Sequence, residues 1–353
     1  MEAPELKRPR VGLVGPMLGS NPGWAVGQGE VLAGLLEREG WEVRTASSRV
    51  NRWLRLWEVA TSPRRWRGQV DVLVLMVFSG PAFRLVEAAS AAASRQGIPM
   101  ILWLHGGNLV EFFTQHPDRV RRVLSRGRIV VAPSEFLAEP FGARVIPNVV
   151  DLDQYPWRHR PSVAPRLLWM RTFHELYRPD LALDVLERLP GASLTMAGQD
   201  KGLLAETRKR AEQRGLDVRF PGFLDAEGKR REFAEHDVFL NTNRVDNAPV
   251  SVLEAAAFGL PVVSTDVGGI PRLLRNGVEA LLVPEGDAEA MAGAVRRLLE
   301  EPGLAGRLST AGREVAERSA WERVRPLWEE LLRALPPDPS PSRTPGPPGE
   351  GGA

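Results

Sequence analysis

The sequence contains no cysteine and very little lysine. The absence of cysteine excludes disulfides, thiolate nucleophiles and cysteine-ligated metal sites. No apolar run approaches the roughly 20 residues of a membrane span, and residues 1–10 lack the apolar centre of a signal peptide. We therefore expect a cytoplasmic protein. The formal net charge of +2 is too small to indicate nucleic-acid binding by itself. The lysines are Lys7, Lys201, Lys209 and Lys229, among 46 basic residues.

The length and composition are those of a globular protein with more than one core. A chain of 353 residues most often forms two domains. Its apolar fraction of 43% and charged fraction of 25% are ordinary for such proteins.

Short apolar runs alternate with segments of helical spacing, which predicts parallel strands joined by helices. In the first half the apolar runs are 11–15, 41–46, 70–77, 100–105 and 129–133, and helical spacing covers 26–39 and 82–96. The second half repeats the pattern at 166–170, 193–198, 218–222, 238–242 and 261–265. The expected fold class is α/β, with two open sheets, right-handed crossovers and a ligand cleft between the carboxyl ends of their strands.

The predicted organisation has four parts. Residues 1–160 form a Rossmann-like first domain and residues 161–319 a Rossmann-like second domain, with the boundary in a polar stretch rich in tryptophan and proline. Residues 320–335 form a C-terminal helix, for which packing back on the first domain is one option. Residues 336–353 are a disordered Pro/Gly/Ser tail.

The most informative segment surrounds two acidic residues, Asp246 and Glu254. The sequence predicts a helix over 252–258, so that Asn247, Ala248 and Pro249 lie at its N-terminus. Unpaired N–H groups and the positive end of the helix dipole favour phosphate there. Glu254 lies one turn inside and can reach a sugar hydroxyl beside that phosphate. Two carboxylates and an anion-binding helix start indicate a nucleotide-sugar site.

Metal and dinucleotide sites are not indicated. The histidines are scattered and none pairs at i, i+4 with another: His105, His116, His159, His174 and His236. The run Asp151-Leu152-Asp153 falls in the interdomain stretch and is interpreted as linker. Residues 27–32 lack the third glycine of a dinucleotide fingerprint. We expect no cofactor and no metal.

Taken together in order and spacing, these segments resemble retaining glycosyltransferases of the GT-B fold, family-4 type, along nearly the whole chain before the tail. The family's E-x7-E signature corresponds to Asp246 and Glu254, followed by AAAFGLPVVSTDVGGIP. Other matches are His105-Gly106-Gly107 at a strand end, PNVVD at 147–151, and Ala197-Gly198.

The resemblance implies roles for particular residues. Glu254 would accept hydrogen bonds from the ribose of the donor, and Asp246 would hold hydroxyls of the transferred sugar. His105 would face the anomeric region of the sugar from the other domain. Arg171 would neutralise the diphosphate as it leaves. The backbone of the helix start at Asn247, Ala248, Pro249 and Val250 would bind the diphosphate, with further donor contacts at Gly198 and Gly23.

Two positions depart from the family pattern. The first acidic residue is more often Glu, and here Asp246 is one methylene shorter. The family usually has Lys six positions after the phosphate-binding Arg, where this chain has Tyr177, followed by Arg178. Arg178 is the candidate replacement for the lysine.

Simpler structural roles remain alternatives for several of these residues. The acidic pair could be a solvated helix start, His105 a core histidine, Arg171 a member of a surface ion pair, and Gly23 part of a plain turn.

A basic stretch near residue 50 is a candidate for contact with the acceptor. Between Arg49 and Arg67 lie six arginines and one acidic residue, interleaved with Trp53, Trp57 and Trp66. Such a helix could contact an anionic membrane surface peripherally, at the inner face of the membrane. The alternative, which we favour, is a solvated basic helix whose tryptophans cover the core. Nucleic-acid binding is disfavoured because no recognition motif accompanies the patch.

The principal functional hypothesis is sugar transfer from a nucleoside diphosphate sugar to a hydroxyl acceptor, with retention, for example in making a lipid-linked or polysaccharide precursor of the cell envelope. The base of the donor could be that of UDP, GDP or ADP. The alternatives are a sugar-nucleotide epimerase of the same architecture and a catalytically silent donor-binding subunit.

Overall fold

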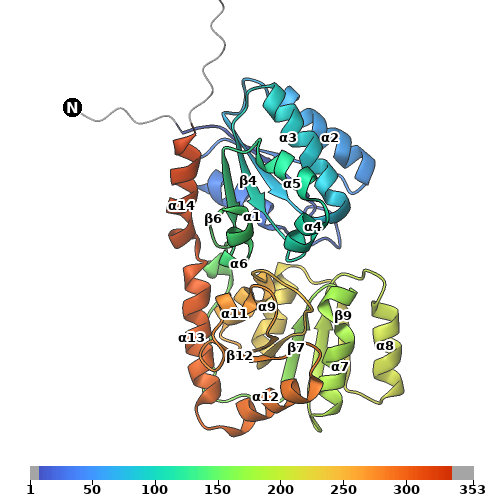
Figure 1. The fold of residues 1–353 in the computed structure, drawn as a ribbon. Helices are drawn as coiled ribbons and strands as arrows, with labels where there is room; N and C mark the ends of the chain where they lie inside the picture. The colour runs from blue at the N-terminus through green and yellow to red at the C-terminus, as the bar shows by residue number, and fades with distance from the viewer. Residues whose placement is uncertain (1–7, 336–353) are drawn as a thin grey trace, which may run out of the picture.

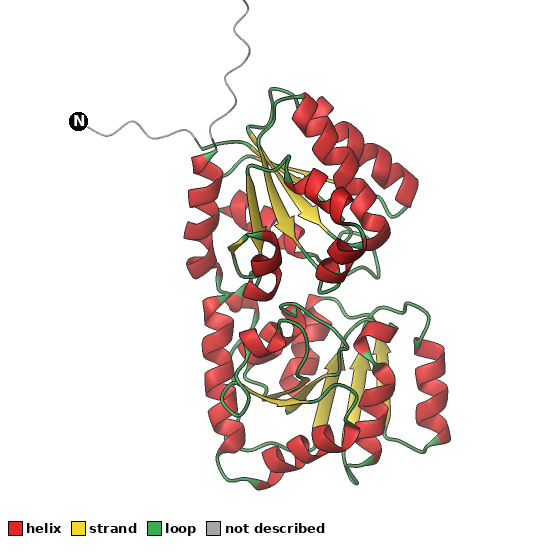
Figure 2. Cartoon of the chain, viewed as in Figure 1, coloured by secondary structure: helices red, strands yellow, loops and turns green. Residues whose placement is uncertain are grey.

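The computed structural model describes residues 8–335, which form two α/β domains stacked end to end (Figures 1 and 2). The predictions for the tail at 336–353 lie outside the described residues. The first sheet has six parallel strands in the spatial order β2 (Val43–Ala46), β1 (Val11–Val14), β3 (Val72–Val77), β4 (Met100–Leu104), β5 (Ile129–Ala132) and β6 (Arg144–Val145).

Helices cover both faces of this first sheet, which is why a strand such as β3 consists of six buried apolar residues in a row. One face packs against α2 and α3, the other against α1 and the C-terminal helix α14. The helices of this half are α1 (Gln28–Arg38), α2 (Arg52–Arg65), α3 (Phe83–Arg95), α4 (Leu109–Gln115), α5 (Pro117–Leu124) and α6 (Glu135–Ala138).

The second sheet repeats the design with a different strand order. Its six parallel strands are β12 (Ala280–Val283), β11 (Val262–Thr265), β10 (Val238–Asn241), β7 (Arg166–Met170), β8 (Ser193–Ala197) and β9 (Val218–Gly222). Around it lie α7 (Pro179–Glu187), α8 (Leu204–Gln213), α9 (Ala226–Glu235), α10 (Val250–Phe258), α11 (Ile270–Leu273), α12 (Ala288–Glu300) and α13 (Leu304–Arg318). The helix α7 packs with α12 on one face, and α10 packs with α13 on the other.

The chain passes between the domains twice, and the two passages are fastened together. The first passage carries Val150, whose N–H donates to the carbonyl of Ser319 at 2.8 Å and which forms a β-bridge with Ala320 in the second passage. Beyond Ala320, α14 (Trp321–Ala334) packs on the first domain, where Trp328 is fully buried. In Figure 1, α13 and α14 run along one side of both domains.

The carboxyl ends of the two sheets face each other, because residues that follow their strands are bonded across the gap. Asn148 donates from Nδ2 to the carbonyl of Ala248 at 2.9 Å, and Ser134, after β5, donates to Asn247, after β10. The predicted α/β class with two facing Rossmann-like sheets is confirmed. Two strands, β6 and β12, were not predicted, and α10 begins at Val250, two residues before its predicted start. Within residues 8–335, no helix is both long and apolar enough to cross a membrane.

Candidate active site between the two domains

Asp246 lies just before α10 and has hydrogen-bond donors on both carboxylate oxygens. Oδ2 accepts from Nη2 of Arg171, in an ion pair, and from Nδ2 of Asn243. Oδ1 accepts from the backbone N–H of Asn247 at 2.8 Å. Three donors from three directions fix the carboxylate in one orientation. Asn243 was not predicted, although it stands only three positions before Asp246.

Arg171, at the end of β7, reaches the first turn of α10. Its Nη1 donates to Oγ of Ser251 at 2.9 Å, and its guanidinium carbon lies 4.3 Å from the centroid of the Tyr177 ring. Tyr177, which stands at the sequence position of the family's lysine, therefore stacks on the arginine. The Nε of Arg171 is buried without a partner among the described residues. The structure thus brings two predicted residues, Arg171 and Asp246, together at a helix N-terminus.

Glu254 lies inside α10 and is buried, with two donors on the same oxygen. Nζ of Lys229 lies 2.5 Å from Oε1, and the hydroxyl of Tyr155 donates to Oε1 at 2.7 Å. Burial and the adjacent negative charge of Glu254 raise the pKa of Tyr155 above its usual range, so the phenol stays protonated and donates. Neither Lys229 nor Tyr155 was predicted, because α9 and the interdomain passage meet α10 only in the folded chain.

His105 follows β4 and is enclosed by aromatic rings. It stacks on Phe78 at 4.9 Å between ring centroids and contacts Trp103 at 4.4 Å. Burial lowers the pKa of His105 from 6.5 to about 3, so its imidazole is neutral near neutral pH. Its Nε2 is buried without a partner among the residues described. A neutral imidazole with an unpaired ring nitrogen suits hydrogen bonding rather than charge stabilisation.

Glycines allow the two halves of the site to approach. A Cβ built on Gly107, two residues after His105, would lie 3.0 Å from the Val245 side chain and 3.2 Å from the carbonyl carbon of Asp246. The strand end that carries His105 therefore lies against the backbone of Asp246. The predicted residues His105 and Asp246 belong to one interdomain site.

Three further glycines pack closely against backbone carbonyls of the site residues. A Cβ on Gly268 would lie 2.1 Å from the carbonyl oxygen of Asp246, and one on Gly269 would lie 2.2 Å from that of Asn247. A Cβ on Gly198 would lie 1.9 Å from the carbonyl oxygen of Arg171. Only glycine permits these contacts, so Gly198 shapes the loop beside Arg171.

The start of α10 connects the second domain to the first. Pro249 is its N-cap residue, with Val250 the first helical residue. Asn247 and Ala248 just before it are the partners of Ser134 and Asn148 of the first domain. The N–H of Val252 donates to the carbonyl of Pro249 at 3.1 Å. The N–H groups of Val250 and Ser251 come before this first helical bond, which leaves them available to an anion.

Two predicted donor residues lie apart from this arrangement. Arg178 donates from Nε to both oxygens of Asp180 at 3.0 Å, and its Nη1 lies 3.7 Å from Glu285. Since its guanidinium is committed to these carboxylates, the structure gives no support to Arg178 as the replacement for the family's lysine. Gly23 is an exposed residue of a loop, with φ of 79° and open space around a built Cβ, as in a plain turn.

The basic stretch forms α2, and its tryptophans differ in their surroundings. Trp66, just after the helix, is buried in the core, as the favoured interpretation predicted. Trp53 and Trp57, one turn apart, are 63% and 62% exposed, so for them that interpretation was wrong. Arg52 lies over the ring of Trp53 and Arg65 over that of Trp57. Val50 and Leu54 extend the exposed apolar surface.

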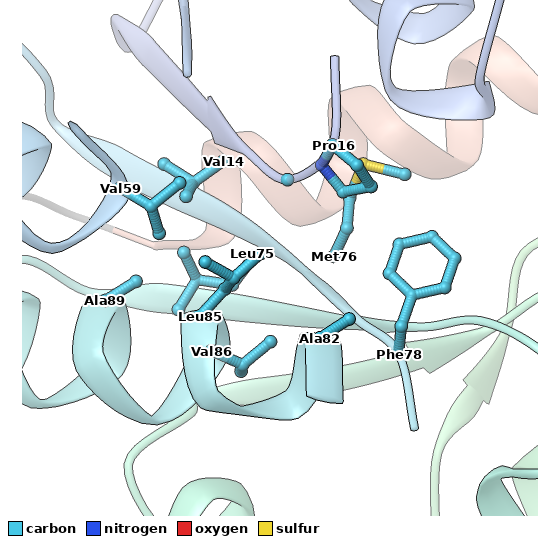
Figure 3. Close-up of a pocket in the computed structure, with 11 residues that line it drawn as sticks. Val14, Pro16, Val59, Leu75, Met76, Phe78, Ala82, Leu85, Val86 and Ala89 are labelled. Atoms are coloured by element: carbon cyan, nitrogen blue, oxygen red, sulfur yellow. The ribbon is translucent and has the colours of Figure 1, made fainter. Parts of the chain in front are cut away.

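A small apolar recess opens in the first domain near His105 (Figure 3). The volume open to a water-sized sphere inside it is only about 10 Å³, room for about one water molecule, and apolar side chains line it throughout. Pro16 after β1, Val59 of α2 and Leu85 of α3 line it, and Phe78, the ring that stacks on His105, lies at its edge.

Comparison with known proteins identifies the second domain. Residues 164–301 match the family described as "Glycosyl transferases group 1". The phosphatidyl-myo-inositol mannosyltransferase of Mycobacterium leprae is 31% identical over 194 residues, which cover 51% of this chain and 50% of that protein. The glycogen synthase of Mycobacterium tuberculosis is 26% identical over 304 residues, or 78% of this chain and 70% of that protein. The chain thus spans about half the length of the first of these relatives.

Solved structures agree on the architecture. Sucrose-phosphate synthase from Thermosynechococcus elongatus has a TM-score of 0.77 at 18% identity, with 93% of this chain and 99% of that chain covered. HepE of Anabaena in complex with UDP-glucose has a TM-score of 0.71 at 17% identity, with 93% and 100% covered.

The fold is therefore the two-domain GT-B fold. Its second domain, at residues 164–301, is that of the group 1 glycosyl transferases, family-4 type, so the resemblance to that family is confirmed, whereas retention stays a prediction.

Proposed function

We propose that the protein transfers a sugar from a nucleoside diphosphate sugar to a hydroxyl group. The acceptor oxygen bonds to the anomeric carbon as the bond from that carbon to the diphosphate oxygen breaks. The acceptor proton passes to the leaving diphosphate. The observation that carries the proposal is the joining of Arg171 and Asp246 at the N-terminus of α10, against the strand end of His105.

Each group has a task in this reaction. The first turn of α10 and Arg171 stabilise the negative charge that grows on the diphosphate. Asp246 accepts hydrogen bonds from hydroxyls of the transferred sugar, while Glu254 accepts them from the ribose. His105, neutral because its pKa is lowered to about 3 by burial, offers its unpaired nitrogen to the sugar from the other domain.

We further propose that the reaction proceeds with retention. Asp246 is held by Arg171, Asn243 and the N–H of Asn247, which makes its carboxylate a poor nucleophile. The leaving diphosphate can instead accept the proton on the face that the acceptor attacks. Arg171 supplies a positive charge to the leaving group, so we propose catalysis without a metal or other cofactor.

The transfer is tested by a screen for binding and a measurement of product. UDP-, GDP- and ADP-sugars are each added to the protein, and a donor that binds raises the melting temperature. The donor that binds is then incubated with hydroxyl acceptors, and NMR of the product shows whether the anomeric configuration is kept. An inverted product would contradict retention. Isomerisation of the donor without acceptor would favour an epimerase, and binding with no turnover would favour a silent donor-binding subunit.

We propose that the acceptor is presented at an anionic membrane surface by the exposed side chains of α2. Trp53 and Trp57 provide rings suited to the depth of the headgroups, and the arginines around them attract anionic lipid, by about 1 kcal/mol each. The helix begins at the carboxyl edge of the first sheet, which faces the second domain, because it follows β2.

Sedimentation with vesicles tests this surface. Wild-type protein should bind vesicles of phosphatidylcholine with phosphatidylglycerol and release them at high salt. Combined Trp53→Ser and Trp57→Ser substitutions should weaken that binding about tenfold or more. Trp157→Ser is the matched control, since Trp157 is exposed but belongs to the first interdomain passage. Equal binding by wild type and the double variant would overturn the proposal.

A further inference from the structure

Basic side chains near the start of α10 are already neutralised. A donor diphosphate carries negative charge on both phosphoryl groups and needs positive charge to offset it. Three basic side chains at this end of the second domain are each paired with a carboxylate: Arg171 with Asp246, Lys229 with Glu254, and Arg178 with Asp180. A basic side chain without a carboxylate partner could therefore offset the charge of the diphosphate without first breaking an ion pair.

Lys201 carries such a charge. Within residues 8–335, no carboxylate oxygen lies within ion-pair distance of its Nζ. The ammonium lies instead 4.5 Å from the centroid of the Trp24 ring. Trp24 belongs to the glycine-rich loop before α1, so Lys201 points across the gap to the other domain. A cation–π contact at an exposed site is weak, and a phosphate can displace it.

The backbone places Lys201 in the same layer as Arg171. The N–H of Lys201 donates to the carbonyl of Phe173 at 3.2 Å, and the N–H of Phe173 donates to Gln199 at 2.9 Å. The N–H of Arg171 donates to Ala197 at 3.1 Å. The loop 198–201 therefore runs beside residues 171–173, at the carboxyl ends of β7 and β8, where open α/β sheets bind ligands.

We propose that Lys201 is a second cation for the donor diphosphate and takes the part that neither Tyr177 nor Arg178 plays. On binding, its ammonium leaves the Trp24 ring for a phosphate oxygen. The inference rests on the proposed function, because it concerns the same donor. Lys201 would thus bind the diphosphate, and the Trp24 ring would hold the lysine ammonium by a cation–π contact until the donor binds.

Calorimetric titration with nucleotides tests the assignment. UDP, GDP and ADP are titrated into wild-type protein, and the one that binds is compared with its parent nucleoside. Lys201→Gln should weaken the diphosphate about tenfold or more and leave the nucleoside unchanged. Lys201→Arg should restore most of the affinity. Lys209→Gln, a substitution of a lysine on α8, is the matched control and should bind as wild type does.

The variant Trp24→Leu distinguishes two roles for Lys201: binding phosphate, or holding the domains together through its contact with Trp24. If Lys201 binds phosphate, the loss of the ring releases the lysine, and the diphosphate affinity should stay equal or rise. If Trp24→Leu weakens the diphosphate as much as Lys201→Gln does, the contact serves to close the cleft and the assignment is overturned. Wild-type affinity in Lys201→Gln would also overturn it while leaving the proposed function intact. Failure of wild-type protein to bind any of the three diphosphates would overturn the proposed function.

Discussion

Arg171 and Asp246 form an ion pair at the first turn of α10, with side chains only 12% and 15% exposed. The carboxylate of Asp246 thus partly neutralises the positive charge that Arg171 would offer to a diphosphate. Asp246→Asn should lower turnover by roughly 10- to 100-fold, since charge-assisted hydrogen bonds to the sugar are lost. The affinity for a nucleoside diphosphate without sugar should stay equal or rise, because Arg171 is freed.

Initial rates and calorimetry on Asp246→Asn check these two effects separately. A parallel fall in turnover and in diphosphate affinity would mean that Asp246 only holds Arg171 in place. Asp180→Asn, which removes the partner of Arg178, is the control and should leave both quantities near their wild-type values.

Glu254 should determine whether the protein distinguishes ribose from deoxyribose. Glu254→Gln should weaken a ribonucleoside diphosphate by about tenfold or more, but should affect its 2′-deoxy analogue much less. Tyr155→Phe keeps the carboxylate and removes one of its two donors, so it should preserve the preference for ribose. Binding constants of wild type and both variants for each of the two nucleotides check the prediction. Equal losses for both nucleotides would place Glu254 away from the ribose.

The neutral state of His105 should appear in the pH dependence of stability. Its pKa is about 3 in the folded protein, against 6.5 as the ordinary value, because burial disfavours the charged ring. The unfolded chain therefore binds the proton first as pH falls. The contribution to the free energy of unfolding is constant above pH 6.5 and is lost between pH 6.5 and 3, at up to about 1.4 kcal/mol per pH unit.

Urea unfolding of wild type and His105→Phe between pH 7.5 and 4.5 measures this effect. As pH falls, the free energy of unfolding of wild type should decrease more steeply than that of His105→Phe. The difference in slope should correspond to the uptake of up to one proton on unfolding. His236 is buried as well, and burial lowers its pKa, so its contribution has the same direction and remains in both proteins. Identical slopes for the two proteins would show that folding does not lower the pKa of His105.

Two glycines with similar backbone angles should respond differently to substitution. Gly268 and Gly277 have φ of 56° and 77°, so a side chain costs about 1–2 kcal/mol at either position. At Gly268, a Cβ would also meet the carbonyl oxygen of Asp246 at 2.1 Å, whereas open space surrounds Gly277. Gly268→Ala should therefore destabilise the protein more and weaken donor binding, and Gly277→Ala should keep donor binding unchanged. Thermal melts with and without nucleotide check both.

Hydrophobic patterning predicted most of the fold because the interior strands are continuous apolar runs. The strand β3 is six buried apolar residues and leaves no ambiguity. The edge strand β6 has only Arg144 and Val145, too short for any pattern to show. The edge strand β12, at 280–283, pairs with β11 alone on its sheet and follows a charged loop. Only β6 lacks a sequence signal, because β12 is the apolar run Ala280–Val283 and the pattern could have shown it.

The site was predictable where its residues are close in sequence and unpredictable where they come from distant segments. The run from Asp246 to Glu254 could be placed at a helix start from spacing alone. The partners Lys229 and Tyr155 could not, since they lie 25 and 99 positions from Glu254. Exposure of Trp53 and burial of Trp66 likewise depend on how α2 packs, which composition does not reveal.

The tie between Val150 and Ser319 has a mechanical consequence. Both passages of the chain are pinned at one point, so a rigid rotation of one domain against the other has its pivot there. Displacement grows with distance from a pivot, and the loop that leads into α8 lies on the side opposite α13 (Figure 1). A rotation of a few degrees would therefore displace that far edge most, while the pinned side would barely move.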